Sequence, residues 1–192
     1  MRCDDWLHCR RYKRRTILRL AVAPLLLAGP LRAAEEGEAA KPLAPDDRFA
    51  FLTGPKKGQV VRAKDLALGG PQVQAYPMAP DGTVRSDSRL NLVILARFDL
   101  GALADETRAR AAEGVVAYWA ICTHQACPVN MWSKERNAFV CSCHGSVFDP
   151  RNAAEVIGGP APRPLPALGL KLKDDVVTVA STFSGRVGGT QG

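Results

Sequence analysis

The chain has 192 residues, 46% of them hydrophobic, which is enough apolar material for one domain of ordinary size. Its net charge of +7 is concentrated at the N-terminus, because residues 1–33 carry eight Lys or Arg and two Asp, a net charge of +6 that leaves only +1 for the rest. The remainder of the chain is therefore nearly neutral. This distribution indicates no basic face for the phosphates of a nucleic acid.

The N-terminal segment, residues 1–33, has the pattern of an export leader. Arg14-Arg15-Thr-Ile-Leu-Arg19 resembles a twin-arginine signal, an apolar run from Leu20 to Leu31 follows it, and Ala33-Ala34 offers a small-residue exit. As a helix the run would be about 18 Å long, against about 30 Å of hydrocarbon in a bilayer. We predict a twin-arginine export signal, with a short uncleaved membrane anchor as the alternative.

Composition divides the rest of the chain into a linker, one domain and a tail. Residues 34–45 are rich in Ala, Glu and Pro and predict a flexible linker. The folded domain is expected over residues 46–183. A Gly-rich flexible tail is expected over residues 184–192.

Short apolar runs separated by turns predict an all-β domain with small antiparallel sheets. The Asp81-Gly82 pair predicts a tight turn, and residues 99–113 predict a surface excursion or a short helix. Ordered structure is expected to begin near residues 48–52, and the expected strands are 59–62, 90–98, 115–121, 138–140, 168–172 and 176–179.

Two short loops between Ile121 and Phe148 concentrate the reactive side chains. Loop one is Cys122-Thr-His124-Gln-Ala-Cys127, and loop two is Cys141-Ser-Cys143-His144-Gly-Ser146. Each loop offers one Cys and one His, as C-x-H and C-x-x-H, with a second Cys left over. This count is consistent with four metal ligands and one disulfide.

Two thiolates on one iron and two imidazoles on the other form the mixed-ligand [2Fe-2S] centre. Two ferric ions, two sulfides and two thiolates sum to zero charge, whereas four thiolates would leave a dianion that resists reduction. Neutral His ligands therefore favour acceptance of an electron. The ligand set predicts a centre with a higher potential than an all-thiolate ferredoxin.

The two loops resemble those of the Rieske iron–sulfur proteins, and specifically the high-potential branch found in cytochrome bc complexes and arsenite-oxidase small subunits. The resemblance implies that Cys122 and Cys141 ligate one iron and that His124 and His144 ligate the other. It also implies that the Ser146 hydroxyl donates a hydrogen bond to a bridging sulfide.

The same resemblance implies a disulfide between Cys127 and Cys143, and a base β-sandwich with a small cluster-binding subdomain at its tip. The run from Gly158 to Pro162 matches the proline loop that shields the cluster in this family. The chain departs from the family at two positions, with Ala126 where Gly is common and Phe148 where Tyr is common.

The Cys and His residues are also compatible in type with a zinc site or a c-type haem. A zinc-binding interaction module with Cys₂His₂ ligands suits the ligand types, but it leaves Cys127 and Cys143 without a role. A c-type haem requires C-x-x-C-H, which loop two does not contain.

The predicted function is one-electron transfer outside the cytoplasm, as a relay and not as a stand-alone catalyst. The expected partners are the large subunit of a molybdenum oxidoreductase, a c-type cytochrome or a cupredoxin. The expected location is the periplasm or the outer face of the cytoplasmic membrane, because the leader resembles a twin-arginine signal. That route exports proteins that are already folded, which suits a chain that must bind its cluster in the cytoplasm. The alternative is the quinol-oxidising subunit of a cytochrome bc complex, although that role implies an apolar residue where this chain has Gln125.

Overall fold

The computed structural model describes residues 41–187, so the predicted leader, most of the predicted linker and the last five residues of the predicted tail lie outside it. Within the described residues, no helix has both the length and the apolar content that a membrane span requires. The strands are β1 (Arg48–Phe51), β2 (Val73–Met78), β3 (Val93–Arg97), β4 (Val115–Trp119), β5 (Val129–Ser133), β6 (Ala138–Cys141), β7 (Val147–Asp149), β8 (Glu155–Gly158), β9 (Ala167–Lys173) and β10 (Val176–Phe183), and the helix α1 spans Asp105–Arg110.

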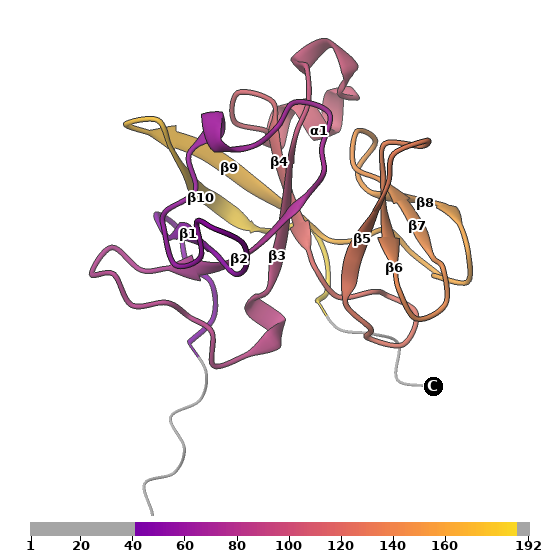
Figure 1. Cartoon of the computed structure of the whole chain (residues 1–192), viewed down its shortest axis with the longest axis horizontal. Coiled ribbons are helices and arrows are strands. Elements are labelled where there is room, and N and C mark those ends of the chain that lie inside the picture. Colours follow the sequence, from indigo (N-terminus) through magenta and orange to yellow (C-terminus); the bar gives the residue numbers. More distant parts are fainter. Residues whose placement is uncertain (1–40, 188–192) are drawn as a thin grey trace, which may run out of the picture. The chain divides into compact units, whose positions relative to one another are not determined.

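Six strands form a closed antiparallel barrel in the order β1-β10-β9-β4-β3-β2 (Figure 1). Closure depends on β1, in which Arg48 pairs with Met78 of β2 on one side and with Thr178 of β10 on the other. The barrel interior is filled by side chains such as Phe49 and Leu95, both fully buried. The all-β prediction is confirmed, and the expected base sandwich is joined along both edges into a barrel.

Two strand predictions differ markedly from the structure. The strand expected over 90–98 begins at Val93, because residues 89–91 form a 3₁₀ turn that the Ser88 hydroxyl caps by accepting from the Leu90 amide. The strand expected over 59–62 is reduced to isolated bridges. There Val60 pairs with Ala50 and Arg62 pairs with Val176.

The other four strands form a separate antiparallel sheet in the order β5-β6-β7-β8, beside the barrel (Figure 1). Trp132 of this sheet contacts Phe139 and also Phe98 from the barrel side, with ring centroids 5.8 and 6.3 Å apart. Gly70 must lack a side chain, because a Cβ there would lie 2.3 Å from the Trp132 ring. The two sheets therefore share one core, in which aromatic rings fill the space between them.

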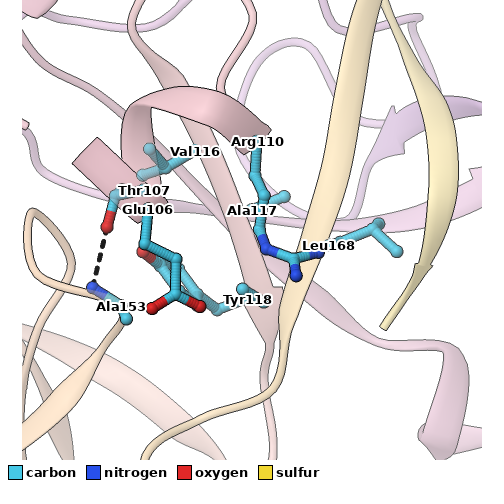
Figure 2. Close-up of a pocket in the computed structure, with 9 residues that line it drawn as sticks. Glu106, Thr107, Arg110, Val116, Ala117, Tyr118, Ala153 and Leu168 are labelled. Atoms are coloured by element: carbon cyan, nitrogen blue, oxygen red, sulfur yellow. Dashed lines mark hydrogen bonds between the residues drawn. The ribbon is translucent and has the colours of Figure 1, made fainter. Parts of the chain in front are cut away.

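Helix α1 joins the barrel to the turn between β7 and β8 (Figure 2). The Thr107 hydroxyl accepts a hydrogen bond of 2.8 Å from the Ala153 amide, and the Ala104 amide donates to the Arg151 carbonyl at 3.0 Å. The cavity beneath α1 has a volume of about 10 Å³, which holds at most one water. This contact is therefore structural and leaves no room for a ligand.

The turn that α1 holds is conformationally strained. Ala153 and Ala154 both have left-handed backbone conformations, with φ of 47° and 49°. A left-handed residue other than glycine costs roughly 1–2 kcal/mol, so external contacts must stabilise this turn. Thr107 and the Leu165 amide, which donates to the Ala154 carbonyl at 3.3 Å, supply them.

Both ends of the described chain are attached to the barrel. The Lys41 carbonyl accepts a hydrogen bond of 2.8 Å from the Asn91 side chain. The Ser184 amide donates to the Ala167 carbonyl at 2.7 Å. These contacts include residues from the predicted linker and the predicted tail, so the domain extends at least to them.

We predict that Thr107→Val lowers the free energy of unfolding by about 1–3 kcal/mol, because the half-buried Ala153 amide would lose its acceptor. Thr107→Ser, which retains the hydroxyl, is the matched control and should lie much closer to wild type. Chemical denaturation monitored by circular dichroism measures both variants. Equal stabilities for Thr107→Val and wild type would show that the turn does not depend on this bond.

Candidate metal centre

Loop one follows β4, and loop two begins at the last residue of β6. The two loops have the same pattern of backbone hydrogen bonds. The amide of the first Cys donates to the carbonyl of the residue five positions later. The carbonyl of the same Cys accepts from the amide of the residue four positions later. In loop one these bonds measure 2.7 and 3.1 Å, and in loop two 2.8 and 3.1 Å. Each loop is therefore a compact turn that presents its Cys and His from fixed backbone.

Ala126 in loop one occupies the position that Gly145 occupies in loop two. Both are left-handed, with φ of 56° for Ala126 and 70° for Gly145. The departure from the common Gly therefore does not change the backbone, although Ala pays a conformational cost of roughly 1–2 kcal/mol that Gly avoids. The Arg89 guanidinium stabilises this turn by donating a hydrogen bond of 2.6 Å to the Ala126 carbonyl.

A disulfide between Cys127 and Cys143 joins the two loops, with the Cα atoms 6.3 Å apart. This pairing confirms the one predicted. The Cys141 sulfur lies within 4.8 Å of both disulfide sulfurs. Since a disulfide sulfur is not a thiolate, this group of three sulfurs supplies only one metal ligand, Cys141.

The two remaining thiols in the described part of the chain, Cys122 and Cys141, are each 1% exposed. Burial raises the pKa of the Cys122 thiol, while hydrogen bonds from the His124 backbone and from Ser146 lower it and the adjacent Cys141 raises it further. The two thiols therefore lie side by side in a site that disfavours free thiolates. A bound metal would supply the positive charge that stabilises them.

The two imidazoles lie nearer the surface than the thiols. His144 is exposed and His124 is half-buried. Their ring centroids are 4.8 Å apart and their planes meet at 88°. The four predicted ligands thus separate into a buried thiol pair and a more exposed imidazole pair, as a two-iron centre with unlike ligands at each iron requires.

Residues 158–162, the predicted proline loop, pack directly on loop two. A Cβ on Gly159 would lie 2.5 Å from the Ser146 Cα, so only glycine permits this approach. The Ala161 amide donates a hydrogen bond of 3.1 Å to the Ser146 hydroxyl oxygen. The amide thereby orients the hydroxyl, whose own hydrogen remains free to reach the Cys122 sulfur.

Loop one is held to the same segment by a contact that sequence reasoning missed. Thr123, fully buried, donates through its hydroxyl to the Arg163 carbonyl at 2.6 Å. Arg89, in the 3₁₀ turn before β3, was also missed. Neither residue belongs to a recognisable motif, because both contacts join segments that are distant in sequence.

A family comparison identifies this site. The pattern of the Rieske [2Fe-2S] domain matches residues 100–169, which include both loops and the proline loop. The chain therefore contains a Rieske [2Fe-2S] domain, and its cofactor is a Rieske-type [2Fe-2S] cluster. A zinc module is not supported, since the family match specifies iron and sulfide.

The domain is similar to Rieske iron–sulfur subunits of several complexes. The chain is 43% identical over 63 residues to the cytochrome bc1 complex Rieske subunit of Streptomyces lividans, covering 33% of this chain and 37% of that one. It is 40% identical over 76 residues to the putative respiratory nitrate reductase Rieske subunit of Haloferax mediterranei, covering 39% and 34%. It is 42% identical over 59 residues to the cytochrome b6-f iron–sulfur subunit of a Cyanothece species, covering 31% of each.

The chain thus spans only about a third of the length of these relatives. It is related to them through the cluster-binding region. This relation shows Rieske iron–sulfur electron transfer as the general function of the domain.

We predict that the double variant Cys127→Ser, Cys143→Ser unfolds with about 3 kcal/mol less free energy than wild type. The two cysteines are 16 residues apart, and closing a loop of this size restricts the unfolded chain by about that amount. The cluster should still form but should be lost on mild heating, which visible absorption follows during a temperature ramp. A double variant that retained its colour as long as wild type would contradict this role for the disulfide.

Proposed function

We propose that this chain transfers single electrons outside the cytoplasm as the small subunit, or a soluble partner, of a periplasmic oxidoreductase. Cys122 and Cys141 would ligate one iron, and His124 and His144 the other. The cluster, when bound, supplies a one-electron redox couple. The observation that carries this proposal is the exposure of the imidazole pair above buried thiols, which gives electrons a short path to the surface.

The protein residues around the site hold the ligands and control the charge. Loop backbone and the disulfide fix the thiols, and Gly159 and Ala161 close one side against Ser146. The Ser146 hydroxyl is placed to donate to the Cys122 sulfur, in a centre that would become more negative on reduction. Donors of this kind favour the reduced state.

A nitrate reductase Rieske subunit among the relatives supports a role beside a periplasmic oxidoreductase. The cytochrome bc1 and b6-f relatives support the alternative, a quinol-oxidising subunit of a cytochrome bc complex. Gln125, exposed directly after the first His ligand, favours the first role. The Rieske resemblance implies an apolar residue there for quinol oxidation.

The experiment that separates these roles is co-purification of the tagged full-length chain from the periplasmic and membrane fractions of its own host, with partners identified by mass spectrometry. We expect a periplasmic oxidoreductase subunit, and the reduced complex should pass one electron to a c-type cytochrome or a cupredoxin. Recovery with a b-type cytochrome subunit and quinol oxidation activity would contradict the first role and support the alternative.

We predict that each of Cys122→Ser, His124→Ala, Cys141→Ser and His144→Ala yields colourless protein, because each removes one ligand from a centre that needs all four. Gln125→Ala, in the same loop and exposed, is the control and should remain coloured. Visible absorption and iron content measure the outcome. A normal spectrum in either His variant would refute the ligand assignment.

We predict that Ser146→Ala lowers the midpoint potential and that Phe148→Tyr raises it, each by about 40–90 mV. Phe148 is fully buried in the core that contains Cys122 and Cys141, so a Tyr hydroxyl there would add a donor near the ligand sulfurs. A differential of roughly 1–2 kcal/mol per hydrogen bond corresponds to that range, since tenfold in a one-electron equilibrium is about 59 mV.

Protein-film voltammetry measures these potentials. Ser142→Ala, the same chemical change at an exposed position of loop two, is the matched control and should leave the midpoint unchanged. Unchanged or reversed shifts in both test variants, with the cluster intact, would mean that these side chains do not face the sulfurs.

A further inference from the structure

The surface around the exposed imidazoles has an uneven distribution of charge. Loop one, loop two and the proline loop contain no Asp or Glu. Arg163 follows the proline loop directly, and Arg89 reaches loop one from the barrel. The site is therefore bordered by cations, with no carboxylate in the loops that form it.

Hydrogen bonds tie the segments that carry these cations to loop one and to one another. The Arg89 guanidinium contacts the Ala126 carbonyl, two residues from His124. Arg163 is joined to loop one through its own carbonyl, which accepts from the Thr123 hydroxyl, and its guanidinium donates to the Arg186 carbonyl at 2.9 Å. We call Arg89, Arg163 and Arg186 the arginine patch.

An exposed apolar side chain lies beside Arg186, and Glu106 lines the cleft that Arg163 and Arg186 share. Leu90 is 47% exposed and lines the same cleft as Arg186. Among residues 41–187, no ion pair joins Arg89 or Arg186 to a carboxylate. Asp87 is the carboxylate nearest to Arg89 in the sequence. Its side chain is exposed, and none of these ion pairs includes it.

We infer that the arginine patch, with Leu90 in the cleft beside Arg186, is the docking surface for a redox protein that presents acidic side chains around its own electron-transfer site. This inference rests on the proposed electron-transfer function and names the class of partner. The patch borders the loop that holds His124, so an acidic partner bound to it would lie over the imidazoles. Opposite charges steer encounter and set orientation, and both matter more for a transient electron carrier than high affinity.

The exchange itself needs no bond formation. One electron leaves the reduced chain and reduces one Cu(II) of a cupredoxin, or one ferric haem, to Cu(I) or ferrous iron. The arginines take no part in that step. Their role is to place the acceptor over the histidines, which makes them positioning residues.

The test uses the full chain with its cluster, reduced and mixed in stopped flow with an acidic plastocyanin-type cupredoxin. Arg186→Glu is the principal variant, because only the Arg186 backbone, and not its side chain, appears in the contacts above. At about 10 mM ionic strength, where the Debye length is about 30 Å, we expect its second-order rate constant to fall roughly threefold to tenfold below wild type. The difference should disappear near 1 M salt, where charges are screened within about 3 Å.

Two controls separate docking from other effects. Lys173→Glu makes the same charge reversal on the β9–β10 hairpin, which lies on the side of the barrel away from the cluster sheet in Figure 1, and should leave the rate near wild type. Tris(phenanthroline)cobalt(III), a cationic oxidant, should react faster with Arg186→Glu than with wild type. The midpoint potential of each variant is also measured, to exclude a change in driving force. A rate difference caused by a changed potential would persist at high salt, whereas one caused by docking would not.

The outcomes distinguish this inference from the proposed function. If wild type, with a reduced cluster verified by EPR, transfers no electron to the cupredoxin, the proposed function fails. If it transfers electrons but Arg186→Glu matches wild type at every salt concentration, the docking inference is overturned. Binding to phosphatidylglycerol vesicles that Arg186→Glu abolishes, with an unchanged cupredoxin rate, would also overturn it and assign the patch to a lipid surface.

Discussion

The fixed relation between the two ligand loops is the constraint on which the rest of the structure depends. The two loops lie 14 or more residues apart in the sequence, and no single strand or helix carries both. Two thiols and two imidazoles must nevertheless converge on one site. The disulfide, the matching backbone turns and the proline loop packed on Ser146 provide that convergence. Below them, the barrel supplies a rigid base through Trp132, Phe98 and the contact of α1 with the β7–β8 turn.

The sequence predicted most accurately what short-range chemistry determines. The spacing of Cys and His identified both loops, the Rieske resemblance implied the disulfide between them, and continuous apolar runs such as Leu92–Leu95 predicted β3. Barrel closure was not predictable, because it depends on the pairing of Arg48 with Thr178 across most of the chain. β2 was missed for a local reason, since Gln74, Tyr76 and Pro77 interrupt any simple alternation.

At the site, the unpredicted features are contacts between distant segments. Arg89 holds the turn at Ala126, and Thr123 holds the segment after the proline loop. Neither follows from spacing, since each requires the fold to bring a remote residue to loop one. Ala126 also shows that a glycine position within a family can accept alanine when surrounding contacts offset its left-handed strain.

The most direct test of the central claim is pulsed EPR of the reduced full-length chain, with histidine labelled by ¹⁵N. The account predicts hyperfine couplings from two directly bound histidine nitrogens, assigned to His124 and His144, on a single [2Fe-2S] signal. A spectrum with no histidine nitrogen coupling, or with coupling from only one, would contradict the two-thiolate, two-imidazole site proposed for this protein.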